Sequence, residues 1–206
     1  AQAKIPVVLI DYDIVPPPDR SACDLVGIDN FEAGRRVAIH LLAAGAKRIG
    51  FLINDYPSYS VRKRFEGVKS VVAAHGGPTA GMLLRGDPSD RKAVGAYLRT
   101  YRPDAIVCAW DTLAAHLGGT LASLGRTVGG DILLAGFDDV QHATIMTPPL
   151  TTIHQPCAEI GETAYRVLLD RIAHPELPPC ELTLAAPLVV RGSTRFTKKQ
   201  KKRKRK

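Results

Sequence analysis

Three acidic residues follow strand-like segments of this chain, at places where a carboxylate could hold a polar ligand. Asp11 follows the apolar run 5–10, Asp29 follows 25–28, and Asp138 follows 131–136. An ionised carboxylate accepts hydrogen bonds through both oxygens, so Asp138 suits two vicinal hydroxyl groups, Asp11 could accept from one hydroxyl group, and Asp29 would line the cleft. Each also has a simpler role open to it, because Asp11 could stabilise a turn, Asp29 could cap a helix and Asp138 could cap its loop.

Three further side chains offer complementary chemistry. Arg64 carries five donors in a fixed fork, which suits a polyol or a carboxylate, although a surface ion pair with Glu66 or Asp55 is the alternative. Ser60 lies four residues earlier and adds a hydroxyl group. Trp110, the sole tryptophan, could stack on the apolar face of a pyranose or on a base, or could fill a gap between lobes.

Signatures of catalysis and of metal binding are weak. The sequence has no G-x-S-x-G, P-loop, G-x-G-x-x-G or H-E-x-x-H pattern. His154 and Cys157 are three residues apart, but a proline separates them, so a catalytic Cys/His pair is poorly supported. The adjacent Asp138 and Asp139 could suggest a metal site, but no further ligands accompany them. We interpret Asp139 as a structural residue. The four cysteines are widely spaced and fit reduced thiols in a cytosolic protein. We therefore expect no enzyme, no cofactor and no metal.

Strand-like runs alternate with helical periodicity along most of the chain. This alternation predicts βαβ units and a parallel sheet, in which ligands bind beyond the carboxyl ends of the strands. The run 5–10 is predicted to be buried on both faces, and 182–191 is predicted to be a final strand interrupted at Pro187. The expected strands are 5–10, 25–28, 48–53, 82–84, 104–109, 131–136, 150–153 and 182–191.

The net charge of +8 comes from one segment, the tail KKQKKRKRK at 198–206. Without its eight Lys and Arg residues the chain has 20 basic and 20 acidic residues, a balanced body. Such a dense run of like charge is expected to be disordered and to attract polyanions without reading sequence. No apolar run is long enough to span a membrane and no secretory signal is apparent, which favours the cytoplasm.

Five segments, in order, resemble one family. The most informative, VGGDILLAGFDDVQHATIMTPPLTTIHQPCAEIG at 128–161, joins a buried strand, an acidic pair, a Pro-Pro break, a short strand and a helix start. The others are VGIDNFEAGRRVAIHLLAAGAKRIGFL at 26–52, RFEG at 64–67, AIVCAWDTLAA at 105–115 and LVVRGST at 188–194. Together they resemble the lactose-repressor (LacI/GalR) family of transcription regulators. Trp110 departs from the family pattern, which normally has asparagine there.

The resemblance implies a two-lobed, periplasmic-binding-protein-like α/β fold with parallel sheets flanked by helices. It predicts an incomplete first lobe at 1–29 and 149–181, a second lobe at 30–148 and 182–195, and a disordered tail at 196–206. A small effector, a monosaccharide or a similar polyol, would lie between the lobes, contacted by Arg64 and Asp138. Closure of the lobes would follow effector binding.

The same resemblance implies partners. Relatives pair their cores as homodimers, and here the helix after Trp110 would present Leu113 and Leu117 to the partner. Operator DNA would be bound only through a helix-turn-helix headpiece, which we do not find before Ile5. Two alternatives stay open: a solute-binding protein of a sugar ABC transporter, and an enzyme on a doubly wound sheet.

Overall fold

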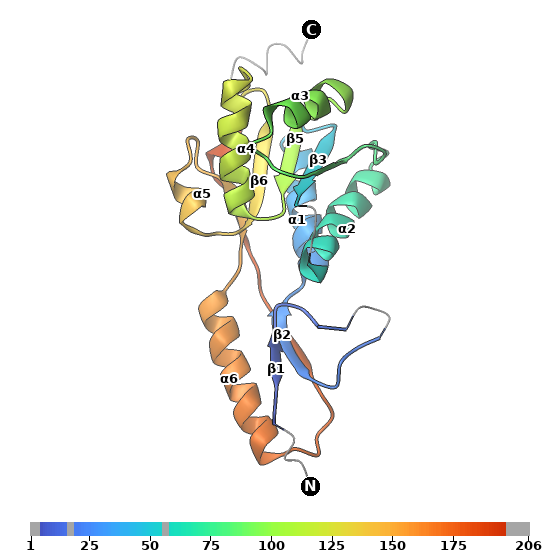
Figure 1. Cartoon of the computed structure of the whole chain (residues 1–206), viewed down its shortest axis with the longest axis vertical. Helices are drawn as coiled ribbons and strands as arrows, with labels where there is room; N and C mark the ends of the chain where they lie inside the picture. The colour runs from blue at the N-terminus through green and yellow to red at the C-terminus, as the bar shows by residue number, and fades with distance from the viewer. Residues whose placement is uncertain (1–4, 16–18, 55–57, 197–206) are drawn as a thin grey trace. The chain divides into compact units, whose positions relative to one another are not determined.

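The chain folds into two compact units. The computed structural model describes residues 5–15, 19–54 and 58–196. The first unit comprises residues 1–29 and 155–186, and the second comprises 30–154 and 187–206. Each unit combines a sheet with flanking helix, as Figure 1 shows, so the α/β class predicted from the sequence is confirmed.

The second unit is built on a sheet that has six strands within the described residues. Every hydrogen-bonded pair is parallel except the last, β7 with β9. β3 and β5 are buried along their whole length, as parallel strands with both faces covered should be. In spatial order the strands are β4 (Leu83–Arg85), β3 (Ile49–Ile53), β5 (Ala105–Cys108), β6 (Leu133–Asp138), β7 (Thr151–His154) and β9 (Leu188–Val189).

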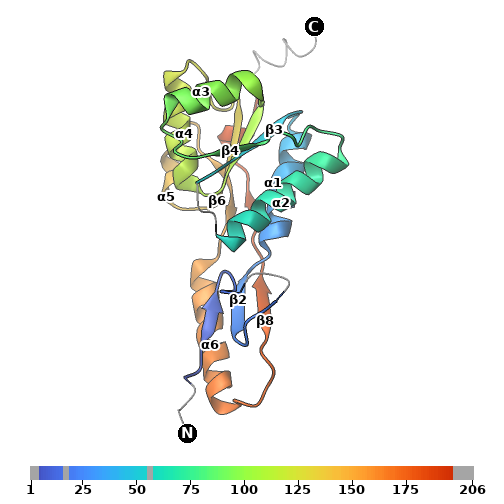
Figure 2. The ribbon, with the colours of Figure 1, turned by 45° about the vertical axis from the view of Figure 1, so that its right-hand side comes forward.

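Helices cover this sheet. They are α1 (Asn30–Ala43), α2 (Tyr59–Ala74), α3 (Arg91–Thr100), α4 (Asp111–Ser123), α5 (Gln141–Ile145) and the short 3-10 helix η1 (Gly192–Thr194). α4 packs on β5 and β6, while α1 and α2 pack on each other (Figures 1 and 2). Leu113 and Leu117 of α4 are both buried inside this unit. The expectation that these two side chains face a second copy is therefore wrong, because their apolar surface already lies in the core.

A pair of glycines lets α1 and α2 approach closely. A Cβ atom added at Gly34 of α1 would lie 2.2 Å from the Arg64 carbonyl oxygen, and one added at Gly67 of α2 would lie 2.0 Å from the Phe31 carbonyl oxygen. Real Cβ atoms do not approach backbone oxygens so closely, so glycine is required at both positions. The packing of these two helices fixes where the first turn of α1 lies relative to Arg64.

The first unit has a smaller sheet, which within the described residues consists of three parallel strands in the order β1 (Val8–Ile10), β2 (Asp24–Ile28) and β8 (Glu181–Leu184). The helix α6 (Cys157–Ala173) packs against β1 and β2. β2 is buried throughout, but β1 is only half-buried and ends on an exposed Ile10. The prediction that 5–10 is buried on both faces is therefore wrong, because β1 is an edge strand here.

One buried ion pair ties α6 to β2 in the first unit. The Asp24 carboxylate accepts from Arg171 Nε at 2.9 Å and Nη2 at 2.8 Å, and also from the Cys180 backbone N–H at 2.8 Å. The Asp24 side chain is 1% exposed and the Arg171 side chain 17%. These hydrogen bonds, with that from Arg171 foremost, lower the pKa of Asp24 to about 2.

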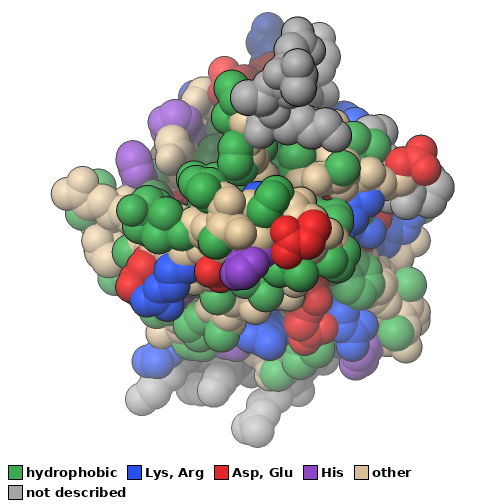
Figure 3. All heavy atoms as spheres, turned by 90° about the horizontal axis from the view of Figure 1, so that it is seen from below, with side chains coloured by type: hydrophobic (Ala, Val, Ile, Leu, Met, Phe, Trp, Pro, Cys, Tyr) green, Lys and Arg blue, Asp and Glu red, His purple; other side chains and the backbone are tan. Residues whose placement is uncertain are grey.

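Much apolar surface of the first unit faces solvent. In the space-filling view of Figure 3, hydrophobic side chains are prominent between charged ones. The exposed large apolar residues of this unit include Ile5, Ile14, Tyr165, Leu169, Ile172 and Leu177. Tyr165, Leu169 and Ile172 recur at helical spacing on α6, so they form one stripe of that helix.

Two expected placements need correction. The strand expected at 150–153 in the first lobe is β7, and it pairs with β6 in the second unit. The single strand expected at 182–191 is two strands, β8 in the first unit and β9 in the second. The chain crosses between the units at 154–155 and 186–187, rather than at the expected 148–149 and 181–182. Pro187 marks this crossing rather than an interruption within one strand.

Candidate functional site

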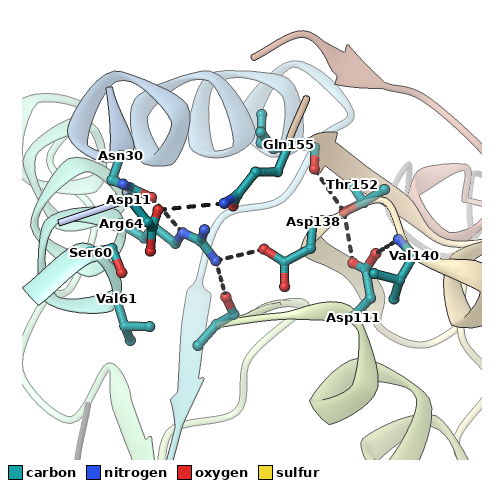
Figure 4. Close-up of polar contacts among 12 residues, drawn as sticks. Asp11, Asn30, Ser60, Val61, Arg64, Asp111, Asp138, Val140, Thr152 and Gln155 are labelled. Carbon is teal, nitrogen blue, oxygen red and sulfur yellow. Dashed lines mark hydrogen bonds and ion pairs between the residues drawn. The ribbon is translucent and has the colours of Figure 1, made fainter. Parts of the chain in front are cut away.

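A buried arginine organises the carboxyl edge of the second unit's sheet. Arg64 Nε donates to Asn30 Oδ1 at 2.7 Å, and Nη1 donates to the Ala109 carbonyl at 2.8 Å and to Asp138 Oδ1 at 3.1 Å. Asn30, Arg64, Ala109 and Asp138 are called the Arg64 cluster below, and Figure 4 labels Asn30, Arg64 and Asp138. They come from α1, α2, the segment after β5 and the end of β6, so four parts of the sequence meet at one edge.

Burial of Arg64 explains why it has several partners. Its side chain is only 5% exposed, and a charge in such a place must be paired and hydrogen-bonded. The guanidinium also lies over the Phe137 ring, with Cζ 4.7 Å from the ring centroid. The planar group is held in one orientation by contacts on its edge and on its face, so it is pre-organised as a donor.

Asp138 combines an unusual backbone with partial exposure. It is the last residue of β6, with φ of 100°, and the next residue Asp139 has φ of 59°. Two consecutive non-glycine residues in the left-handed region are rare, and such strain concentrates at ligand sites. The Asp138 side chain is 30% exposed. It therefore contacts the buried arginine and still reaches the surface.

Asp139 has a structural environment, as the sequence interpretation expects. Its carboxylate lies 2.7 Å from Arg191 Nη2 and 3.1 Å from His154 Nδ1. Arg191 in turn donates to the Leu150 carbonyl at 3.0 Å. These contacts join the loop after β6 to the segments at the ends of β7 and β9, which fixes the turn that carries Asp138.

A second buried carboxyl group, Asp111, lies at the start of α4. Its oxygens accept from Thr152 Oγ1 at 2.7 Å and from the Val140 backbone N–H at 3.1 Å. Burial raises the pKa of Asp111 to about 7, and the negative charge of Asp138 adds to this, although the hydrogen bonds act in the opposite direction. Asp111 is thus a titratable group close to neutral pH that links α4, β7 and the loop after β6.

The sequence interpretation singles out Arg64, Asp138, Ser60 and Trp110 in what is now the second unit. Arg64 and Asp138 are in contact. Ser60 is buried one helical turn before Arg64, with its Oγ 2.8 Å from Ser58 Oγ. Trp110 is half-buried and follows Ala109, the carbonyl acceptor of Arg64. Trp110 and Asp138 lie at the carboxyl ends of strands, and Ser60 and Arg64 lie in the first two turns of α2, so all four belong to the segments at one edge of the sheet.

Arg64 does not form the surface ion pair with Glu66 that the sequence left open. Arg64 is buried, and Glu66 Oε2 lies 3.6 Å from Lys63 Nζ instead. Asp55 lies outside the described residues.

Asp11 and Asp29 lie in the first unit. The Asp11 backbone has φ of 74°, and its N–H donates to the Val26 carbonyl at 2.9 Å, which fits the turn role. Its carboxylate also accepts from Gln155 Nε2 at 3.5 Å. Asp29 is exposed at the end of β2, directly before α1.

Sequence reasoning missed three polar residues of the second unit. Asn30 is buried and its side-chain oxygen accepts from Arg64. Asp111 is buried and accepts from Thr152. Asn54 follows β3 and has a buried Oδ1 with no hydrogen-bond partner among the described residues. Their common signal is a polar residue within three positions of the end of a buried strand, since β2 ends at Ile28, β3 at Ile53 and β5 at Cys108.

The described residues contain no group of three or more His, Cys, Asp or Glu side chains placed to hold a metal ion. Among them, no helix combines the length and the apolar character that a membrane crossing requires.

The second unit is a parallel α/β unit with a preorganised polar cluster at its carboxyl edge. These features indicate a class of ligand-binding proteins but do not identify an individual protein. The family of periplasmic binding protein-like domains matches residues 38–194, and the chain belongs to this family. The TM-score to a LacI family transcriptional regulator from Enterococcus faecium, solved with bound ribose, is 0.80 at 28% identity, covering 94% of this chain and 71% of that one.

Curated relatives agree. An HTH-type transcriptional repressor named PurR from Mannheimia succiniciproducens is 31% identical over 196 residues, covering 93% of this chain and 58% of the relative. The ribose operon repressor of Escherichia coli strain K12 is 31% identical over 194 residues, covering 92% and 58%. The resemblance to the lactose-repressor family is thereby confirmed. The chain spans under two thirds of the length of these relatives.

Proposed function

We propose that this chain is the effector-binding part of a LacI-type transcription regulator, and that its effector is a monosaccharide or a similar polyol. The observation that carries the proposal is the contact of the buried Arg64 with Asp138 at the carboxyl edge of the sheet. The related regulators favour this function over a transporter's solute-binding protein, and they are transcriptional repressors rather than enzymes.

The chemistry of the Arg64 cluster suits a polyol. A carboxylate next to a guanidinium accepts hydrogen bonds from two neighbouring hydroxyl groups, while the guanidinium donates to a hydroxyl or ring oxygen. Trp110, two residues from the end of β5, offers an aromatic face for the C–H side of a sugar ring. In this proposal Ser60, Asp11 and Asp29 supply additional polar contacts.

Isothermal titration calorimetry against a panel of sugars, polyols and nucleosides tests the proposal. Fluorescence of Trp110, the sole tryptophan, gives a second readout in the same unit. Asp138→Asn keeps the size of the side chain, and Arg64→Lys keeps the charge but removes the fork. Each should weaken binding by about 1–3 kcal/mol for each lost hydrogen bond.

Lys63→Met is the matched control, because Lys63 lies on the same helix but pairs with Glu66 at the surface. If Asp138→Asn and Arg64→Lys, both folded by circular dichroism, bind the identified ligand as tightly as Lys63→Met, the site assignment is wrong. If no member of the panel binds the parent protein, the ligand class is wrong.

The proposal extends to partners. We propose a cytoplasmic homodimer that contacts operator DNA through a DNA-binding segment outside residues 1–206. The tail 198–206, which lies outside the described residues, would add nonspecific affinity for polyanions. Sedimentation at tens of micromolar tests the dimer, and a folded protein that stays monomeric would contradict it.

A further inference from the structure

A pocket lies at the opposite, amino edge of the second unit's sheet. It has a volume of about 500 Å³ and lies between the end of α3 and the segment that connects α4 to β6. Leu98, Pro103 and Ile132 give it apolar walls, and Arg99, Arg102 and Arg126 surround them with positive charge. Pro103 lies two residues before β5 and Ile132 directly precedes β6, so this pocket and the Arg64 cluster are at opposite ends of the same strands.

The three arginines that line the pocket are not neutralised by ion pairs. Arg99, Arg102 and Arg126 are exposed, and among the described residues none of the three forms an ion pair. Three like charges that converge on one pocket repel each other, and a bound anion relieves that repulsion.

The one carboxylate that lines the pocket is engaged elsewhere. Asp131 Oδ2 accepts from the backbone N–H and from the hydroxyl of Thr127, both at 2.9 Å. It therefore holds the turn before β6, and its charge only partly offsets that of the three arginines.

The backbone at Arg102 gives independent support. α1, α2 and α4 are each followed by a glycine in the left-handed region, at Gly45, Gly76 and Gly125. α3 instead has Arg102 there, with φ of 53°, and its Nε donates to the Arg99 carbonyl at 3.3 Å. Glycine is the favoured residue after a helix because it adopts this conformation without a steric cost. An arginine in this conformation has a conformational free-energy cost that glycine would avoid, which indicates that its side chain has a role.

We propose that this pocket binds a phosphate monoester carried on a flat or apolar body. Guanidinium groups suit phosphate oxygens because their parallel N–H groups match the geometry of the anion. Leu98, which is only half-buried, would contact the body of the ligand, since exposed apolar surface gains by leaving water. The carbonyl ends of α3 and α4 disfavour an anion, so the arginines must supply the attraction. The inference is independent of the proposed polyol site.

Hydrogen exchange of the full chain with adenosine 5′-monophosphate as the probe tests this inference. Adenosine and inorganic phosphate serve as separate arms, since one lacks the anion and the other lacks the body. We expect the monophosphate to slow exchange in 98–103 and 126–132, and we expect neither arm to do so at the same concentration. Protection of these segments by inorganic phosphate to the same degree would overturn the role given to the apolar walls.

Variants separate the pocket from general electrostatic attraction. Arg99→Gln and Arg126→Gln should each weaken monophosphate binding by roughly tenfold or more. Arg102→Gly should weaken binding and also raise the melting temperature, because it relieves the backbone cost. Lys92→Gln is the control, since it removes one exposed charge from α3 outside the pocket. The tail 198–206 is the same in all variants.

Equal binding in the parent and in both Gln variants would show that the arginines only cap the helix ends, and would overturn the proposal. So would an equal loss of binding in Lys92→Gln, or protection confined to residues at the carboxyl edge of the sheet.

Discussion

Replacing Arg171 with methionine should loosen the first unit and leave the second intact. Asp24 is almost fully buried, and Arg171 supplies two of the three hydrogen bonds described for its carboxylate. Methionine keeps most of the apolar stem but removes the guanidinium. The variant therefore leaves a buried carboxylate whose remaining donor is the Cys180 backbone N–H.

The pKa of Asp24 sets the magnitude. Its decrease from 3.8 to about 2 would correspond to about 2.5 kcal/mol at full weight, and solvent screening at the partly exposed Arg171 lowers this to about 1–2 kcal/mol. Leaving the carboxylate unpaired adds to the loss, so the variant should cost about 2–3 kcal/mol at neutral pH. Because folding lowers this pKa, the stabilisation is present above about pH 4 and is lost as the pH falls through about 2.

Hydrogen exchange measured by mass spectrometry distinguishes the two units. Arg171→Met should speed exchange in 24–28 and 157–173, while 49–53, 105–108 and 133–138 keep the parent's protection. Arg166→Met is the matched control on the same helix, because Arg166 pairs with Glu162 where the two side chains are 69% and 63% exposed, and such pairs contribute about 0–1 kcal/mol. Equal exchange in the two variants would refute the role assigned to the buried pair.

Three further predictions concern the second unit and the tail. Asp111→Asn should remove part of the pH dependence of the free energy of unfolding. Because folding raises the pKa of Asp111 from 3.8 to about 7, its favourable contribution is complete below about pH 4 and is lost as the pH rises through about 7. Urea unfolding across this range should show a change of at most about 4 kcal/mol. The same pH slope in the variant would contradict this. Gly34→Ala should lower the free energy of unfolding by about 1–3 kcal/mol and weaken ligand binding, because the added Cβ meets the Arg64 carbonyl oxygen. Gly119→Ala is the control, since a Cβ there has nothing within 4 Å, and it should be neutral or slightly stabilising. Deleting 198–206 should abolish retention of the protein on DNA at low salt, and sequence-selective binding that survived the deletion would disprove a purely electrostatic tail.

Local pattern was sufficient for the central strands. β3, β5 and β6 are continuous apolar runs between helical segments, and such runs are buried wherever both faces of a parallel sheet are covered. The strand predictions depend on periodicity, and the position of Asp138 depends on chain direction, because ligand-binding residues gather at the carboxyl ends of strands. Arg64 was singled out by the resemblance to the lactose-repressor family, and in the structure it contacts Asp138.

Pairing between distant segments was not accessible in the same way. β7 and β8 are both short, and neither carries a feature that selects its sheet, so β7 was expected in the wrong unit. The burial of Arg64 also could not be read from its neighbours, because it depends on the close approach of α1 and α2 at Gly34 and Gly67. A glycine inside a helix usually lowers the stability of the helix. Only the position of the facing backbone shows whether the glycine also allows two helices to pack closely.

The Arg64 cluster connects these levels of structure. The two glycines bring α1 against α2, and this packing lets Arg64 Nε reach Asn30 while Nη1 reaches Ala109 and Asp138. The positive φ at Asp138 costs on the order of 1–3 kcal/mol. The contact with Arg64 offsets that cost and aims the carboxylate. Removing the arginine would remove the contact that stabilises the left-handed backbone at Asp138. The effects of substituting Arg64 and Asp138 on the free energy of ligand binding should therefore not be additive.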